Sequence, residues 1–189
     1  MGLMGRQRLA RVANALGFQV VWFATVAGAG SGRAWAGPVA VAVFALATLA
    51  FSSERRGDLA LLAAALPFGF ALDSVWVRLG LMEFASPWPS SDWAPLWILS
   101  LWAGFALTVN HSLSFVCERP ALAIVLGAIG GPLAYVAAER AFGAVALAAP
   151  TPIVVGILGA AWALTVPLLG LAAARLARPA GPVPPGLLR

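Results

Sequence analysis

The chain has 189 residues, of which 61% are hydrophobic and only 10% are charged, and its mean hydropathy is +0.91. A soluble domain carries about a quarter charged residues, so a globule of this composition could not cover its surface with polar groups. The composition excludes a cytosolic enzyme, a nucleic-acid-binding protein and a disordered chain. It predicts an all-α membrane protein that crosses the bilayer several times.

The net charge of +5 does not indicate a nucleic-acid partner, although all twelve positive residues are arginines. The arginines flank apolar segments and do not gather in one cluster, which is typical of signals that orient a membrane protein. The chain holds one cysteine, Cys117, and one histidine, His111. These counts exclude a disulfide framework, a thiolate metal cluster and a multi-histidine metal site. We therefore expect neither a metal nor a cofactor.

The first apolar segment, residues 10–29, begins beside Arg6, Arg8 and Arg11 and is followed by Ala34-Trp35-Ala36, which has the shape of a signal-peptide cleavage site. We favour a membrane helix over a secretory signal for this segment. Asn14, Gln19 and Trp22 are unusual within the apolar region of a signal, and the sequence stays apolar beyond the apparent cleavage site.

A membrane-spanning helix needs about 17–25 mostly apolar residues, and five further segments meet this requirement approximately. The connections between them are short, so we expect a single transmembrane domain over residues 1–177 and a bundle of six helices. The tail, residues 178–189, is rich in proline and is expected to be disordered. The five further segments are residues 34–51, 59–80, 94–115, 121–138 and 152–176, of which the first is the weakest.

The arginines predict the orientation, because cytoplasmic loops carry an excess of positive charge. With six spans, nine arginines fall on one side and three on the other. This distribution places both termini on the cytoplasmic side of a bacterial inner membrane. The nine are Arg6, Arg8, Arg11, Arg55, Arg56, Arg119, Arg175, Arg178 and Arg189, and the three are Arg33, Arg78 and Arg140.

The longest external connection, residues 81–93, contains Trp88 and Trp93, and Trp97 follows one turn into the next segment. Tryptophans gather at the membrane–water interface. We interpret the three as an aromatic belt, and the alternative is a lid over a substrate site.

Polar residues inside a membrane bundle are costly and usually face its interior. One layer of them, on the cytoplasmic side, joins the first and fourth segments. We expect Asn14 and His111 to lie at similar depth and to form a direct or water-bridged hydrogen bond. His111 has two open interpretations, a packing role or a role in handling a proton or a ligand. The layer comprises Asn14, Gln19, Thr108, Asn110, His111, Ser112 and Ser114.

The second polar layer lies toward the outer side and contains Asp73, which is about fifteen residues into its segment. A carboxylate at that depth needs a cation, or it stays protonated with a donor from a serine, Tyr135 or a tryptophan. Arg140 is the expected cation. Asp73 and His111 fall in opposite leaflets, so we do not expect them to form one catalytic pair. A structural ion pair and a functional acid both remain open for Asp73.

The remaining motifs indicate packing more than chemistry. Gly127 and Gly131 form a small-x-x-x-small pattern, which is typical of closely packed membrane helices. The sequence contains none of the common zinc-protease, nucleophile-elbow or phosphate-loop motifs.

The chain contains the runs Asn14 to Phe23, Pro95 to Trp97, Leu101 to Leu113, Arg119-Pro120 and Leu126 to Tyr135. Together these runs resemble a family of small bacterial inner-membrane proteins known as domain of unknown function twenty-eight seventy-eight. The resemblance covers nearly the whole chain and is most specific from Pro95 to Tyr135. It implies no established activity, but the genes of the family often stand near lipid-modifying enzymes of the cyclopropane-fatty-acid-synthase type, which implies a link to membrane-lipid modification.

Three functions remain possible from the sequence. The favoured one is a non-enzymatic membrane component that binds a membrane lipid or a membrane-protein partner, because no paired set of catalytic groups is visible. The second is an intramembrane enzyme acting on an acyl or isoprenoid chain, with Asp73 or His111 as acid or base. The third is a small proton-linked transporter with the two polar layers as gates.

Overall fold

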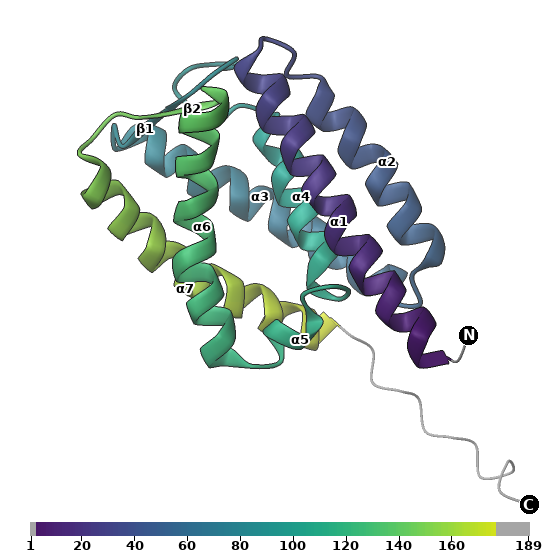
Figure 1. Cartoon of the computed structure of the whole chain (residues 1–189). Helices are drawn as coiled ribbons and strands as arrows, with labels where there is room; N and C mark the ends of the chain where they lie inside the picture. The colour runs from purple at the N-terminus through teal and green to yellow at the C-terminus, as the bar shows by residue number, and fades with distance from the viewer. Residues whose placement is uncertain (1–2, 177–189) are drawn as a thin grey trace, which may run out of the picture.

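The computed structural model describes residues 3–176, which form seven helices and one small antiparallel sheet (Figure 1). The architecture confirms the predicted all-α bundle. The predicted proline-rich tail, residues 178–189, lies outside the described residues. The helices are α1 (Leu3–Gly30), α2 (Ala36–Phe51), α3 (Arg55–Arg78), α4 (Ile98–Val109), α5 (Ser114–Cys117), α6 (Pro120–Phe142) and α7 (Thr151–Leu176), and the strands are β1 (Met82–Phe84) and β2 (Val145–Leu147).

Four of these helices are long and apolar enough to cross a membrane, which makes the chain a membrane protein by length and composition. Two others are apolar but shorter, α2 with 16 residues and α4 with 12. Each of the six apolar segments of the sequence thus contains a helix, and four of these helices reach spanning length. The four are Gln7–Gly30, Arg55–Arg78, Pro120–Phe142 and Thr151–Leu176.

The fourth segment, predicted as one helix over residues 94–115, is the largest departure from the expectation. Helix α4 covers only Ile98–Val109, and a turn at residues 110–113 separates it from α5. The amide of Leu113 donates to the carbonyl of Thr108 at 2.8 Å, and the hydroxyl of Ser114 donates to the carbonyl of His111 at 3.0 Å. Polar side chains in this run compete for the backbone groups that a continuing helix would use.

The helices pack in two pairs around a central pair (Figure 1). Helices α1 and α2 lie side by side, α6 packs along α7, and α3 and α4 lie between these pairs. The predicted small-residue pattern lies in the contact between α6 and α7. A Cβ atom added at Gly127 would lie 2.1 Å from the carbonyl oxygen of Trp162, and one at Gly131 would lie 2.2 Å from the ring of the same residue. The packing interpretation of these glycines is confirmed.

The sheet was not predicted from the sequence. Strand β1 pairs with β2 in antiparallel register, with Met82 opposite Leu147, and so ties the connection after α3 to the connection after α6. The carboxylate of Glu139 accepts a hydrogen bond from the amide of Leu147 at 2.8 Å. Gly143 ends α6 in the left-handed conformation, with φ +60°. Strands of three residues are too short to show an alternating pattern.

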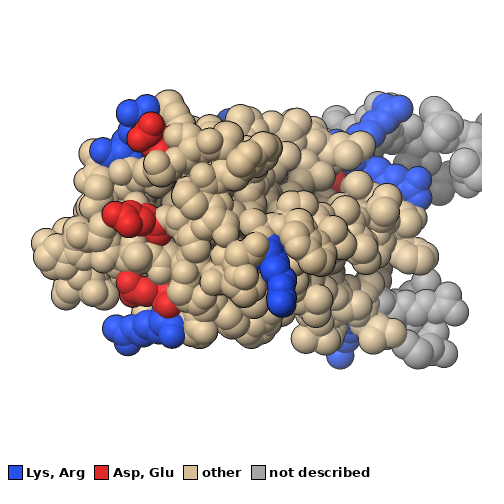
Figure 2. Space-filling model, turned by 90° about the horizontal axis from the view of Figure 1, so that it is seen from above, with Lys and Arg blue, Asp and Glu red and all other residues tan. Residues whose placement is uncertain are grey.

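The charged side chains visible from above gather mainly toward the two ends of the molecule (Figure 2). The surface between them on this face is almost free of charge, apart from one cationic side chain near the middle of the view. A band of surface almost without charge between charged ends is the pattern expected for a protein surrounded by hydrocarbon.

Candidate functional site

An apolar groove with a volume of about 640 Å³ runs along the bundle, lined mainly by α1, α4 and α6, with Trp162 and Val166 from α7. Its volume lies within the range of about 300–1,000 Å³ that is usual for ligand sites. Leu16 and Phe23 on α1 and Leu133 on α6 line it, and each of these side chains is more than half exposed. The groove therefore borders on the exposed apolar surface of the protein.

Aromatic side chains close one end of this groove. The ring of Phe142, in the last turn of α6, packs edge-on against Trp22 and Phe23 of α1, with centroid distances of 5.9 and 6.0 Å. A Cβ atom added at Gly30 would lie 1.8 Å from the carbonyl oxygen of Phe142. Glycine at position 30 thus allows the ends of α1 and α6 to meet, and the groove lies between the two helices before that point.

Asp73 of α3 lies at the base of the groove and is fully buried, with 0% exposure. Its Oδ2 accepts a hydrogen bond from Nε1 of Trp102 at 2.7 Å, and its Oδ1 accepts one from the hydroxyl of Tyr135. We call Asp73, Trp102 and Tyr135 the Asp73 cluster. Gly69, one turn earlier on α3, makes room for it, because a Cβ atom there would lie 2.0 Å from the indole of Trp102.

The prediction that Asp73 forms an ion pair with Arg140 is wrong. Among the side chains that the structure describes, the one contact between an acidic and a basic group joins Asp58 and His111, and Arg140 is exposed near the end of α6. Tyr135 precedes Arg140 by five positions, about 7.5 Å along a helix, so α6 brings its tyrosine to Asp73 and its arginine to the surface. The alternative set of donors, a tyrosine and a tryptophan, is the one observed.

Trp162 of α7 extends the Asp73 cluster along the groove. Its indole stacks on that of Trp102, with centroids 5.2 Å apart and planes 15° apart, and it lines the groove. Its Nε1 is buried and has no hydrogen-bond partner within the described part of the chain. A buried donor without a partner costs about 1–3 kcal/mol, so the position is unfavourable unless an acceptor reaches it.

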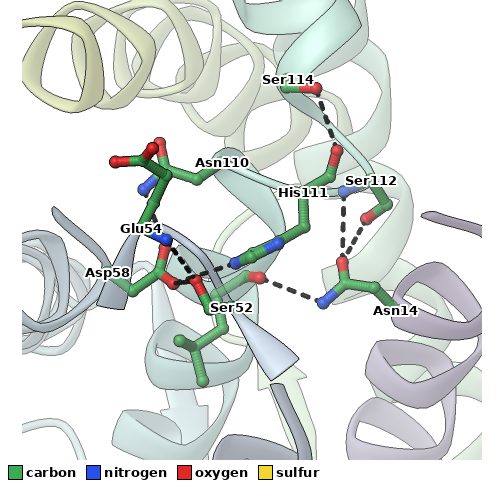
Figure 3. A network of polar contacts seen from close by, with 9 residues as sticks. Asn14, Ser52, Glu54, Asp58, Asn110, His111, Ser112 and Ser114 are labelled. Carbon is green, nitrogen blue, oxygen red and sulfur yellow. Dashed lines mark hydrogen bonds and ion pairs between the residues drawn. The ribbon is translucent and has the colours of Figure 1, made fainter. Parts of the chain in front are cut away.

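A second buried carboxylate, Asp58, was missed in the sequence (Figure 3). Its exposure is 1%. Oδ2 accepts a hydrogen bond from the hydroxyl of Ser52 at 2.6 Å and lies 3.0 Å from Nε2 of His111, and Oδ1 accepts from the amide of Asn110 at 2.9 Å. We call these four residues the Asp58 cluster. Asp58 lies in the first turn of α3, where an acidic residue reads as an ordinary charge flanking a span.

Asn14 joins α1 to the end of α4, as predicted, but through a different residue. Its amide donates to the carbonyl of Leu107 at 3.2 Å, and its Oδ1 accepts from the amide and the hydroxyl of Ser112 at 3.2 and 2.7 Å (Figure 3). The ring of His111 is directed to Asp58 instead. Asn110 and His111 thus belong to the Asp58 cluster, and Asn14 and Ser112 form a separate contact beside it.

The other predicted candidates have simpler surroundings. Gln19 is exposed and Thr108 is buried, and both line the groove, where the hydroxyl of Thr108 donates to the carbonyl of Phe105 at 2.6 Å. Trp97 does not belong to an exposed belt, because it is buried and its Nε1 donates to the carbonyl of Ala85 at 2.9 Å. The other two tryptophans of the predicted belt, Trp88 and Trp93, are exposed.

These features define a helical membrane protein with an apolar groove and two separate buried carboxylates. The family model described as "Protein of unknown function (DUF2878)" matches residues 11–168, so the chain belongs to this family, and the resemblance noted in the sequence is confirmed. No curated protein and no solved structure matches the chain.

Proposed function

We propose that the protein is a non-enzymatic component of the bacterial inner membrane that binds a lipid chain in the groove between α1 and α6. The apolar groove of about 640 Å³, with exposed apolar side chains at its border, is the observation that carries this proposal. A groove bordered by residues that face hydrocarbon admits a lipid chain from within the bilayer. Burial of the chain is then favoured by contact with aromatic and aliphatic side chains.

The proposal includes six membrane-crossing segments with both termini in the cytoplasm. The start of α1 and the end of α7 lie at the same end of the bundle (Figure 1), which agrees with an even number of crossings. Helix α2 is about 24 Å long and α4 about 18 Å, so the turn at residues 110–113 extends the crossing made by α4. The excess of arginines on the side of the termini supports the orientation.

A binding role has more support than an enzymatic or a transport role. Asp58 and His111 lie 3.0 Å apart, but neither lines the groove. Asp73, which does line it, is fifteen positions from Asp58 on α3, about 22 Å along a helix, so the groove holds no acid–base pair of these residues. Each carboxylate is occupied by donors of its own cluster. The link to membrane-lipid modification that the family resemblance implies agrees with a component that holds a lipid for a partner enzyme.

Filling the groove tests this function. Gly130 of α6 lines the groove, and a Cβ atom there meets only the tip of Leu126, at 4.0 Å. Gly130→Leu should therefore place a side chain in the groove with little collision. We expect wild-type protein purified in a mild detergent to carry lipid that mass spectrometry detects, and Gly130→Leu to carry much less.

Gly156→Leu on α7 is the matched control. A Cβ atom at Gly156 meets nothing within 4 Å, and the residue does not line the groove. Both substitutions replace a helical glycine with leucine, so both change helix propensity alike. Equal lipid content in the wild type and both variants would overturn the proposed function.

A further inference from the structure

We propose that the groove takes an amphiphile whose head is a quaternary ammonium group, with the head near Asp73 and the chain along α1. The inference rests on the proposed function and adds the charge and the chemistry of the lipid head. It comes from the carboxylate at the base of the groove and from the aromatic rings that line the groove beside it.

Asp73 gives the base of the groove a negative charge that no cation in its described lining balances. Both carboxylate oxygens accept hydrogen bonds, one from the indole of Trp102 and one from the phenol of Tyr135, which is the pattern of an ionised acid. No lysine, arginine or histidine lines the groove in the described part of the chain. A charge without a counter-ion is costly inside a membrane, so the groove attracts a cation and repels an anion.

Aromatic rings supply the surface that a cation meets in this groove. Phe105 follows Trp102 by three positions on α4 and packs edge-on against Trp162 of α7, with centroids 5.5 Å apart. Phe105 and Trp162 line the groove and are partly exposed, as is Trp22 of α1. The faces of such rings attract cations, and the attraction is strongest where water is excluded.

The shielding of Asp73 decides which kind of cation fits. Its exposure is 0% and its oxygens already accept from Trp102 and Tyr135, so its charge acts through space without offering an open acceptor. A primary ammonium has three N–H donors that need acceptors and is strongly hydrated. A quaternary ammonium has no donor and suits aromatic faces. A phosphocholine head adds a phosphate, for which the described lining has no cation.

The position of Asp73 fixes how the amphiphile lies. Asp73 is five positions before the end of α3, about 7.5 Å along the helix, and so lies toward the end of the bundle that carries β1. The groove extends along α1 from Val26 to Ala15, which is about 16 Å of helix. A head near Asp73 therefore leaves the length of the groove for the chain.

The preference can be measured with ligands that share one chain and differ in the head. Binding of radiolabelled hexadecanol to the purified protein in a neutral detergent is competed with hexadecyltrimethylammonium, hexadecylamine, hexadecylphosphocholine and unlabelled hexadecanol at equal mole fraction. We expect the quaternary ammonium to compete about tenfold better than each of the others, a factor that one desolvated cation–π contact supplies. The net charge of the protein is +5, so general attraction between charges does not produce this preference. Equal competition by the four heads, or stronger competition by any other head, would overturn the subsite.

Asp73→Asn tests the charge. The amide can still hydrogen-bond to both Trp102 and Tyr135, because a phenol accepts as well as donates, and the preference for the quaternary head should fall severalfold while hexadecanol still binds. Asp58→Asn is the matched control, because it removes an equally buried carboxylate of α3 that does not line the groove. Its preference should stay that of the wild type. A preference that persists in Asp73→Asn, or is lost equally in both variants, would overturn the role of Asp73.

Phe105→Leu tests the aromatic surface with the carboxylate intact, and it decides the question if Asp73→Asn does not fold. Leucine keeps the position apolar, so hexadecanol should still bind while the preference for the quaternary head falls severalfold. Phe68→Leu is its control, because Phe68 also packs edge-on against Trp102, at 5.8 Å, but does not line the groove. An unchanged preference in Phe105→Leu, or an equal loss in Phe68→Leu, would overturn the aromatic recognition.

The outcomes separate this inference from the proposed function. If Gly130→Leu does not reduce the binding of hexadecanol, the groove is not the lipid site and both proposals fail. If Gly130→Leu abolishes binding while wild-type protein shows no preference among the heads, only the quaternary ammonium subsite fails.

Discussion

Helix α3 carries two buried aspartates whose surroundings differ in nearly every respect. Asp58, in the first turn, is bound by Ser52, Asn110 and the imidazole of His111. Asp73, fifteen positions later, is bound by one indole and one phenol and has no cation beside it within the described residues. The side chain of His111 keeps 21% exposure, whereas Asp73 lies at the base of an apolar groove.

The difference shows that burial of the same residue type serves two purposes. The donors to Asp58 come from the connection before α3 and from the end of α4. Their hydrogen bonds to the carboxylate therefore hold these two connections together at one end of the bundle. The donors to Asp73 come from the middle of α4 and from α6, and they hold the carboxylate behind a phenol that faces the groove. The first arrangement joins two connections at one end of the bundle, and the second forms part of the wall of the groove in which we propose that a lipid chain binds.

The largest effect is expected from Asp58→Ala. The substitution leaves three polar groups without their acceptor, and each buried polar group left without a partner costs about 1–3 kcal/mol. Because the imidazole is partly exposed, we expect a loss of about 3 kcal/mol in the free energy of unfolding. Unfolding in a detergent–denaturant titration measures it.

Glu54→Ala is the control for that change. Glu54 is exposed, lies four positions before Asp58, and its carboxylate has no hydrogen bond or ion pair in the described part of the chain. Its removal should change stability by less than about 0.5 kcal/mol. If the two variants unfold alike, the Asp58 cluster does not fasten this end of the bundle.

A smaller effect is expected from Asp73→Leu. The apolar side chain is similar in size, so the main loss is that of the acceptor for Trp102 and Tyr135. Two stranded donors, partly offset by the removal of a buried carboxyl group, should cost about 2 kcal/mol. The same titration measures this loss of unfolding free energy. A loss larger than that of Asp58→Ala would contradict the proposal that Asp58 contributes more to the stability of the fold than Asp73.

The sequence predicted one of these clusters better than the other. Asp73 stood out because an acid deep within an apolar segment is rare, and Tyr135 was named among its possible donors. Arg140 was preferred because charge suggests a pair, yet its side chain reaches the surface where its helix ends. Choosing between the two required knowing how α6 is rotated against α3, which depends on the packing of Gly127 and Gly131 against α7.

Asp58 was missed because its position in the sequence is typical of a solvated charge at the end of a membrane span. It follows two arginines at the start of an apolar segment, where a charge is normally solvated. The available signal was the polar run after α4, in which Asn110 and His111 both need partners. Only the turn at residues 110–113, which the apolar pattern did not predict, directs these side chains toward the start of α3.

Cys117 offers a local test of the difference between the clusters. It ends α5, directly after the turn that Asn110 and His111 attach to Asp58. Burial raises the pKa of its thiol, and the nearby Glu118 raises it further. A raised pKa means less thiolate at a given pH, so alkylation should be slow at pH 8 and should accelerate as the pH rises.

If the Asp58 cluster holds this end closed, Asp58→Ala should expose the thiol, lower its pKa toward the ordinary value and speed its alkylation at pH 8. Asp73→Leu should leave the rate close to that of the wild type, because its cluster lies elsewhere on α3. Rates are compared by mass spectrometry well below the unfolding temperature of each variant. Equal acceleration in both would indicate general loosening and not a local fastening.

The smallest effects compare two residues on α6, Arg140 and Tyr135. Arg140 is exposed and has no ion-pair partner within the described residues, so Arg140→Ala should change stability by less than about 0.5 kcal/mol. Tyr135→Phe removes the donor to Asp73 but keeps the ring, and should cost about 1 kcal/mol. An ion pair between Asp73 and Arg140 would give the reverse order, because the arginine variant would then strand a buried carboxylate at a cost of about 3–5 kcal/mol. The order of these two values in one titration therefore decides whether hydrogen bonds from the phenol and the indole, without a cation, stabilise the carboxylate at the base of the groove.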